Sequence, residues 1–320
     1  MPDRDSLSRL LRGRGLSTLL CGSAAAFTLL LSACGTSSTT GNGHNTGGAV
    51  PTATVSCPDA STVSSWHLVN SGQLTVASDT TYAPAEFINT STNQPEGYDI
   101  DLAKELARRL CLTASIKTAN FGDIIPNLSS APLGQGTFDM SISSFTINDL
   151  RKQKVDMIPY FQAGESLLVP TGNPSGIKDF ASMCGKTIAA QDNTVEQFEL
   201  EDANGGNNQS GQAPVCKSNP IKIVHNPDEN LVILAVINGT ADASYQDSPV
   251  TSYYVSQHAG KLVVGGITVA PSPEGLVMRK DNPGLETAIN TALTNMRTDG
   301  TYLRLLTAWG QQDNAYPPLS

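Results

Sequence analysis

Four short polar segments carry side chains that could bind a charged small molecule, and each follows a run typical of a β-strand. They are Ser78-Asp79-Thr80-Thr81-Tyr82, Ser143-Ser144-Phe145-Thr146, Gln191-Asp192-Asn193-Thr194 and Gln246-Asp247-Ser248. In open α/β sheets, ligands bind beyond the carboxyl ends of the strands, where helix N-termini present unpaired amide groups. The segments combine hydroxyl and amide groups, which suit an anion, with carboxylates, which suit a cation.

One arginine could complete such a site. Arg151 is the only arginine between Arg109 and Arg279, and a guanidinium can form a two-pronged contact with a carboxylate. A ligand with both an α-carboxylate and an α-ammonium fits this mixture of groups. Two other interpretations remain open from the residues alone. Arg151 lies in Arg-Lys-Gln-Lys and could be a solvated surface charge, and Asp247 could cap a helix that begins before Pro249.

An alternation of strand-like and helical runs surrounds the first two polar segments. Strand-like runs at 74–78 and 113–117 enclose a helical run at 99–110, in which apolar residues recur at helical spacing. The connection between the strands is long enough for a parallel crossover. A helical run around 123–129 and a strand-like run at 138–143 continue the pattern. This part of the chain therefore predicts an α/β lobe.

The same alternation starts again after Pro174 and predicts a second α/β lobe. Its elements are strand-like runs at 187–191, 221–225 and 241–246, a helix from about Thr194 and a helix at 228–238. Strand-like runs around 166–169 and 262–269 are bordered by Gly and Pro, and we expect the chain to cross between the lobes there. The helices near 286–296 and 302–309 would then return to the first lobe, which leaves one cleft between the two lobes.

The N-terminus has the order of a secretory signal. Four arginines precede an apolar run of 16 residues, which closes on Leu31-Ser32-Ala33-Cys34. A cysteine directly after Leu-Ser-Ala resembles a bacterial lipobox, which implies cleavage after the signal peptide 1–33 and attachment of a diacylglycerol to Cys34. The mature protein would then be anchored at the extracellular face of the cell membrane. An ordinary signal peptide and a short membrane anchor are the alternatives, although the run is short for a membrane span.

The chain beyond the signal is acidic. Removal of residues 1–33 takes away four of 20 basic and two of 29 acidic side chains, which leaves 16 against 27 and a net charge of about −11. An acidic surface repels phosphate backbones, so nucleic acid is excluded as a partner. Residues 35–50 contain almost no apolar side chain and are expected to form a flexible tether. The four histidines lack the spacing of a metal site, and no metal or cofactor is expected.

Four cysteines remain beyond Cys34, and an even set in an oxidising compartment favours disulfides. Three pairings are possible. Cys184 and Cys216 flank one segment in the middle of the chain, so we favour a Cys184–Cys216 bond, with Cys57–Cys111 as its complement. Free buried thiols are the alternative.

Seven motifs, in the same order along the chain, resemble those of the bacterial extracellular solute-binding proteins of family 3, which serve polar amino-acid ABC importers. The matching segments are Ser78–Phe87, Gly97–Ala103, Ile124-Ile125-Pro126, Ser143 and Thr146 followed by Arg151, Gln191–Thr194, Asp247–Val250, and Asp299–Tyr302 with Trp309-Gly310. The resemblance covers about residues 73–310. It implies a two-lobe, periplasmic-binding-protein-like α/β fold of type II. Each lobe would be a mostly parallel sheet flanked by helices, with the ligand in the interlobe cleft.

The expected domain boundaries follow from this resemblance and from the lipobox. They are 1–33 for the signal peptide, 34–72 for the lipidated cysteine, the tether and an N-terminal extension, 73–170 for the first part of lobe 1, 171–268 for lobe 2, and 269–320 for the return segment of lobe 1.

The resemblance also assigns a ligand-binding set. Its members are Asp79, Tyr82, Phe121, Ser143, Ser144, Thr146, Arg151, Gln191, Thr194 and Asp247. Arg151 would bind the ligand carboxylate, with help from Thr146 and from the backbone at Thr194. Asp247 would bind the ammonium together with Ser144.

Other members of the set would surround the ligand side chain. Tyr82 and Phe121 would form apolar walls, and Asp79 would lie at the pocket mouth, where it binds a polar ligand end or fixes the loop. The residues alone also allow plainer roles, in which Tyr82 and Phe121 belong to the core and the hydroxyl groups near 143–146 only end a strand.

Three positions depart from the family pattern. Ala85 stands where a larger residue is usual, Asn193 where Gly is usual, and Val195 where a second Thr is common. Asn tolerates the left-handed backbone conformation that Gly would supply. These departures affect the expected identity of the ligand side chain and leave the capture of the carboxylate and ammonium unchanged.

The expected function is therefore that of a monomeric, lipid-anchored receptor without enzymatic activity. It would close its lobes on an amino acid or related zwitterion and deliver it to an ABC permease with its ATPase. One alternative is an enzyme, because some members of the fold family dehydrate arogenate- or prephenate-like acids, and Glu165 and Glu274 near the predicted crossings could supply the required acid. The other is an anchored ligand-sensing ectodomain.

Overall fold

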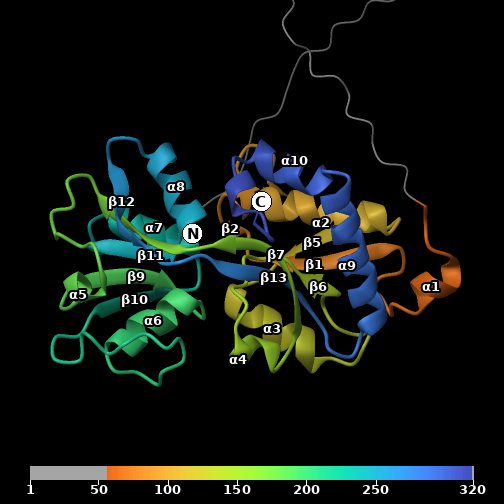
Figure 1. The fold of residues 1–320 in the computed structure, drawn as a ribbon, viewed down its shortest axis with the longest axis horizontal. Helices are drawn as coiled ribbons and strands as arrows, with labels where there is room; N and C mark the ends of the chain where they lie inside the picture. The colour runs from red at the N-terminus through yellow and green to blue at the C-terminus, as the bar shows by residue number, and fades with distance from the viewer. Residues whose placement is uncertain (1–55, 319–320) are drawn as a thin grey trace, which may run out of the picture. The chain divides into compact units, whose positions relative to one another are not determined.

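The computed structural model describes residues 56–318, so the predictions for the signal peptide, Cys34 and the tether lie outside the described residues. This part of the chain forms two five-stranded sheets flanked by helices and one small three-stranded sheet (Figure 1). We call the sheet that contains β1 (Gln73–Ser78), with its helices, the first lobe. The sheet that contains β9 (Thr187–Gln191), with its helices, is the second lobe. Among residues 56–318, none of the helices combines the length and the apolar character that a membrane span requires.

The first lobe is built around a sheet in the order β5-β1-β6-β13-β7. Its other strands are β5 (Thr113–Thr118), β6 (Met140–Ser141), β7 (Asp156–Ala163) and β13 (Ser272–Met278). Its helices are α2 (Tyr98–Arg109), α3 (Phe121–Ser130), α4 (Asp149–Lys152), α9 (Pro283–Thr298) and α10 (Thr301–Ala308). Val76, Leu106 and Ile289 share one apolar core. The C-terminal helices therefore pack on the first lobe although they follow the second lobe in sequence.

The second lobe has a sheet in the order β10-β9-β11-β8-β12. Its other strands are β8 (Glu165–Pro170), β10 (Lys222–Asn226), β11 (Ala243–Asp247) and β12 (Leu262–Thr268). Its helices are α5 (Phe180–Met183), α6 (Val195–Ala203), α7 (Glu229–Ile237) and α8 (Ser248–Gln257). Ile188 and Ala190 belong to one apolar cluster and Ala189 to another, because successive side chains of a strand point to opposite faces. Both faces of the sheet are therefore buried.

Both sheets are mixed, whereas the resemblance implies mostly parallel sheets. In the first sheet, β1 pairs in parallel with β5 and β6, but β13 is antiparallel to β6 and β7. In the second sheet, β9 pairs in parallel with β10 and β11, but β8 is antiparallel to β11 and β12. The antiparallel pairs involve β8 and β13, which lie next to the crossings between the lobes. Parallel pairing requires a crossover connection, usually a helix, and no such connection joins these strands to their neighbours in the sheet.

The first crossing between the lobes lies earlier than the sequence predicts. The expected boundary at 170 assigns β8 to the first lobe, but β8 pairs with β11 and β12 of the second sheet. The crossing therefore falls at Gly164, between β7 and β8. Apolar residues continue on both sides of this glycine, so no change of composition marks the point where the strand changes sheets. The return crossing lies between Thr268, where β12 ends, and Ser272, where β13 begins.

The N-terminal extension is attached to the first lobe. It contains the short helix α1 (Ala60–Ser64), and the following Trp66 is buried in the core of this lobe. Asn282 Nδ2 donates a hydrogen bond to the carbonyl oxygen of Trp66 at 2.7 Å. Two disulfides, Cys57–Cys111 and Cys184–Cys216, join the same pairs that the sequence analysis favours.

The small sheet comprises β2 (Thr81–Tyr82), β3 (Glu86–Asn89) and β4 (Gln94–Glu96), and a short 3-10 helix, η1 (Gln312–Asn314), follows α10. The sequence analysis predicts no strand between the strand-like run at 74–78 and the helical run at 99–110. The antiparallel pairing of β2 with β3 places Tyr82 opposite Glu86. Both residues are buried, and both line the pocket described next.

Candidate functional site

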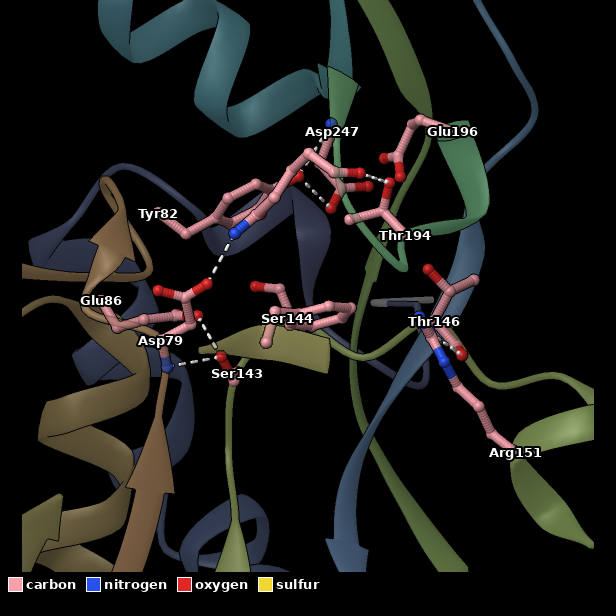
Figure 2. A pocket seen from close by; sticks show the side chains of 12 residues that line it. Asp79, Tyr82, Glu86, Ser143, Ser144, Thr146, Arg151, Thr194, Glu196 and Asp247 are labelled. Carbon is pink, nitrogen blue, oxygen red and sulfur yellow. Dashed lines mark hydrogen bonds between the residues drawn. The ribbon is translucent and has the colours of Figure 1, made fainter. Parts of the chain in front are cut away.

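A pocket between the two lobes brings together all ten residues of the predicted ligand-binding set. It is also lined by Glu86 and Glu196, which the sequence analysis did not select. Figure 2 shows that the labelled side chains converge from both lobes. Within residues 56–318, no group of three or more His, Cys, Asp or Glu residues is arranged to hold a metal ion.

The strand ends explain why these residues meet. Asp79 follows the last residue of β1, and Ser143 follows β6, which is the parallel neighbour of β1. In the second lobe, Gln191 and Asp247 are the last residues of the parallel neighbours β9 and β11. Parallel strands end at the same edge of a sheet, where ligand sites form in open α/β sheets. Thr194, which caps α6, adds a helix N-terminus to the second lobe's wall.

Asp247 and Tyr82 form a contact that spans the cleft. The Tyr82 hydroxyl donates a hydrogen bond to Asp247 Oδ2 at 2.8 Å, and the Asp247 backbone N–H donates to the same hydroxyl at 3.1 Å. Asp247 stands at the N-cap position of α8, but its side chain makes no capping hydrogen bond. Burial raises the pKa of Asp247 to about 6, although the Tyr82 hydrogen bond and the charge of Arg151 act against this rise. The carboxyl group thus faces the pocket.

Arg151 lies in α4 and is buried, with only 9% of its surface exposed, whereas the side chain of the neighbouring Lys152 is 51% exposed. Its Nη1 donates to the Thr146 carbonyl oxygen at 2.7 Å, and its Nη2 donates to the Asn193 carbonyl oxygen of the second lobe at 3.3 Å. Burial lowers the pKa of Arg151 to about 10, so the guanidinium remains charged at neutral pH. The structure therefore does not support the alternative of a solvated surface charge.

Two aromatic rings support this guanidinium. Its central carbon lies 5.3 Å from the ring centroid of Phe121 and 5.1 Å from that of Phe145, and the two rings are stacked with centroids 4.2 Å apart. Such cation–π contacts hold a planar cation in place. Phe121 is therefore both a pocket wall, as predicted, and a support for Arg151. Phe145 provides a second support, which the sequence analysis did not foresee.

Asp79 also links the two lobes. Its Oδ2 accepts a hydrogen bond from Gln191 Nε2 at 2.6 Å, and its Oδ1 accepts one from Thr81 Oγ1 at 2.9 Å. Its backbone N–H donates to Ser143 Oγ at 2.9 Å. Burial raises the pKa of Asp79 to about 6, while the hydrogen bonds from Thr81 and Gln191 oppose the rise. Asp79 therefore contributes a buried carboxyl group to the pocket in addition to fixing its loop.

The two added residues are both glutamates. Glu86 Oε1 accepts a hydrogen bond from Ser143 Oγ at 2.7 Å, and burial, followed by the charge of Asp99, raises the pKa of Glu86 well above its usual range. Burial, followed by the charge of Asp247, raises the pKa of Glu196 to about 8. Both glutamates lie within or next to segments already singled out. Their buried positions depend on the small sheet and on the first turn of α6, which single-sequence periodicity does not reveal.

Two residues with positive φ shape the pocket wall. Ser144 has φ of 43°, and its backbone N–H donates to Asp99 Oδ2 at 3.2 Å. Asn193 has φ of 66°, so it adopts the left-handed conformation for which Asn substitutes for Gly. The Asn193 side chain approaches Gly122 of α3 so closely that a Cβ at this glycine would lie 2.3 Å from Asn193 Nδ2. The lobes thus approach each other closely at Gly122, where a larger side chain would have to displace the Asn193 side chain.

The two-lobe fold and this pocket define a solute-binding protein, and sequence comparison identifies its family. The chain belongs to the bacterial extracellular solute-binding proteins, family 3, whose family model matches residues 74–312. It is similar to the arginine-binding protein ArgT of Corynebacterium glutamicum, with 28% identity over 77% of each chain. The sequence-based family assignment is thereby confirmed, and so is the two-lobe α/β fold.

Two solved structures show the same fold at similar identity. An ancestral arginine-binding protein bound to arginine is 30% identical, with a TM-score of 0.66 over 75% of this chain and 98% of that chain. The ancestral amino acid-binding protein AncCDT-1, described as a precursor of cyclohexadienyl dehydratase, is 32% identical, with a TM-score of 0.63 over 74% of this chain and 95% of that chain. Relatives of this chain are thus amino-acid-binding proteins.

Proposed function

We propose that this protein is the lipid-anchored substrate-binding component of an ABC importer, and that it captures an amino acid between its lobes. The observation that carries the proposal is the pair of buried, oppositely charged groups in one pocket. Within residues 56–318, neither Arg151 nor Asp247 has an ion-pair partner within 4.0 Å. A buried charge without a partner is costly. The α-carboxylate and α-ammonium of an amino acid would supply both partners.

The contacts of these two residues suit such a ligand. The Arg151 guanidinium keeps N–H donors beyond the two that bind backbone carbonyl oxygens. We assign these donors, with Thr146 and the backbone at Thr194, to the ligand carboxylate. Asp247 would accept from the ammonium, together with the Ser144 hydroxyl, whose oxygen has no hydrogen-bond partner among the described residues. Each charge-assisted hydrogen bond of this kind contributes roughly 1.5–3 kcal/mol.

The remaining predicted residues would surround the ligand side chain or hold the closed lobes together. Tyr82 and Phe121 form aromatic walls, while Ser143, Asp79 and Gln191 are joined by hydrogen bonds that run from the first lobe to the second. Opening of the cleft must break the Tyr82 and Gln191 contacts with the opposite lobe. The protein would then release its ligand to a membrane permease driven by its ATPase. We assign the protein to the extracellular face of the membrane, anchored through Cys34, as a monomer.

A thermal-shift experiment with the twenty amino acids tests this function. A ligand present at about 100 times its dissociation constant stabilises the folded state by roughly 2.7 kcal/mol, which raises the melting temperature of a protein of this size by several degrees. A shift with a narrow set of amino acids supports the proposal. The absence of a shift with every amino acid overturns it.

The similarity to a precursor of cyclohexadienyl dehydratase keeps an enzymatic alternative in view. Such chemistry needs an acid beside the substrate. Glu274 is buried and does not line the pocket, and Glu165 lines a different hollow, next to Glu199. We therefore propose binding rather than catalysis. Incubation with prephenate or arogenate, followed by detection of the aromatic product, distinguishes the two functions, because turnover would replace the binding role.

A further inference from the structure

The hinge between the lobes consists of two chain crossings that lie side by side (Figure 1). The chain leaves the first lobe at Gly164 and returns to it just before Ser272. Ala163, before the first crossing, pairs with Ser272, and the Val269 N–H donates a hydrogen bond to the Glu165 carbonyl oxygen at 3.0 Å. Glu165 is therefore the first residue of the second lobe and lies directly at this hinge.

A hollow beside the hinge has walls from both lobes. It shares only Thr146 with the ligand pocket. Two carboxyl groups line it, those of Glu165 and of Glu199 in α6, and no basic side chain among residues 56–318 does so. The first lobe supplies the opposite wall, which consists of Thr146, Ile147, Asn148 and Leu150. Opening of the lobes about the hinge would move this wall away and admit water to the two carboxyl groups.

The Glu165 carboxyl group has no group to neutralise it inside the protein. Its side chain is only 3% exposed, and its Oε2 has no hydrogen-bond partner among the described residues. Glu199 Oε2, in contrast, accepts a hydrogen bond from the Tyr245 hydroxyl at 2.7 Å. Neither glutamate has an ion-pair partner within 4.0 Å in residues 56–318. A buried carboxylate without a cation is costly, and a bound proton removes this cost.

We propose that closure of the lobes holds a proton on Glu165, so that the protein takes up a proton as it binds its amino acid and binds more weakly as pH rises. The inference rests on the proposed function and adds to it a regulation by pH. The lobes are closed in this structure, since Tyr82 and Gln191 donate hydrogen bonds across the cleft. Glu165 does not line the ligand pocket. The linkage therefore acts through closure and applies to whichever amino acid is bound.

The groups around Glu165 favour its protonated form. The titratable groups that face it come from α6 and β11, and they are Glu196, Glu199, Tyr245 and Asp247. Neither the first-lobe wall of the hollow nor β12, the other neighbour of β8, contains a titratable side chain. Arg151, the cation of the ligand pocket, acts on Glu196 and Asp247. Glu165 is thus surrounded by acidic groups and has no cation close by among the described residues.

The sign of the pH effect follows from the closed and open forms. Burial, followed by the charges of Glu196, Asp247 and Glu199, raises the pKa of Glu165 to about 9 in the closed form. Hydration in the open form would return this pKa towards the ordinary range of a glutamate. The proton therefore stabilises closure fully below the pKa of the open form. This stabilisation is lost as pH rises through the pKa of the closed form.

Calorimetric titration of the protein measures the proton uptake. The ligand is the amino acid with the largest thermal shift among those whose side chains do not titrate between pH 5 and 9. It is titrated at pH 7 in phosphate and in Tris, two buffers with different ionisation enthalpies, and the difference in heat gives the number of protons exchanged. We expect an uptake of on the order of one proton. Between pH 6 and pH 8 the affinity should fall by up to about tenfold per pH unit.

Two variants locate the proton. Glu165→Gln replaces the carboxyl group by a neutral amide of similar size, so we expect its proton uptake to be lower by on the order of one proton and its affinity to stay nearly constant from pH 6 to pH 8. Asp139→Asn is the matched control. Asp139 is also buried and its pKa is raised by burial, but it lies within the first lobe, where it accepts hydrogen bonds from the Val69 and Thr75 N–H groups. Its proton uptake is expected to match that of the unchanged protein.

The pH profile of the unchanged protein decides the matter if Glu165→Gln does not fold. Equal proton uptake by a folded Glu165→Gln variant and the unchanged protein overturns the inference, and so does an affinity of the unchanged protein that does not fall between pH 6 and pH 8. Both results leave the proposed function standing, because the amino acid still binds. Failure of all twenty amino acids to bind overturns the proposed function itself.

Discussion

Replacement of Arg151 by alanine tests the carboxylate-binding role most severely. The side chain is buried, lies on the stacked Phe121 and Phe145 rings and has no ion-pair partner among the described residues, so its charge is available to a ligand. Arg151→Ala would leave the ligand carboxylate buried without a charged partner. Loss of one member of a buried, hydrogen-bonded charge pair costs about 2–5 kcal/mol. At about 1.4 kcal/mol per factor of ten, affinity should fall by roughly 30-fold to several thousand-fold.

The assay is calorimetric titration with the amino acid that gives the largest thermal shift. Arg151→Lys keeps the charge but loses the planar fork, so we expect an intermediate loss, on the order of tenfold. Lys152→Ala is the control, because this neighbouring side chain points largely into solvent and should leave affinity unchanged. Circular dichroism melting of each variant shows whether the fold is retained. A folded Arg151→Ala variant with less than a threefold loss of affinity would refute the assignment.

Three further predictions concern the closed cleft, stability and pH. Tyr82→Phe removes the hydroxyl that binds Asp247 across the cleft. Because this hydrogen bond is to a charged group, its loss should weaken ligand binding by roughly 10- to 100-fold in a calorimetric titration. Unchanged affinity would show that this contact does not stabilise the closed cleft. Replacing both Cys184 and Cys216 by serine removes a disulfide whose cysteines are 32 residues apart in the sequence. The free energy of unfolding, measured by urea titration, should fall by about 3–4 kcal/mol. A decrease below about 1 kcal/mol would contradict this stabilising role of the disulfide. Burial raises the pKa of Asp79 from 3.8 to about 6, so the contribution of its protonated carboxyl group to stability is full below pH ~4 and is lost as pH rises through 6. The melting temperature of Asp79→Asn should therefore rise relative to that of the unchanged protein between pH 4 and pH 7. A difference in melting temperature that stays constant over this range would exclude the titration of Asp79.

Much of the fold was predictable because its strands and helices carry local signals. The apolar spacing in 99–110 corresponds to α2, and the strand-like run 187–191 coincides with β9. The placement of β8 in the second sheet was not predictable, because strand pairing is a long-range property and a single Gly164 separates two equally apolar strands.

The candidate site, like the fold, was only partly predictable from the sequence. Most of the ten predicted residues lie at or just beyond strand ends or at helix starts, where topology brings side chains to one edge of each sheet, whereas Thr146 and Arg151 do not. The basic Arg-Lys-Gln-Lys segment gave no local sign that its first residue would be buried while the next is exposed. The burial of Glu86, Asp99 and Glu274 was equally hidden, because an isolated glutamate or aspartate in a sequence is normally solvated. Only the packed structure shows that these carboxyl groups are buried, and of the three only Glu86 lines the pocket.

A crystal structure of the protein with the amino acid that gives the largest thermal shift would test the central claim most directly. The account predicts the α-carboxylate within hydrogen-bonding distance, about 3 Å, of the Arg151 guanidinium. The α-ammonium should contact Asp247. A ligand with its carboxylate away from Arg151, or an empty cleft at saturating ligand, would contradict the account.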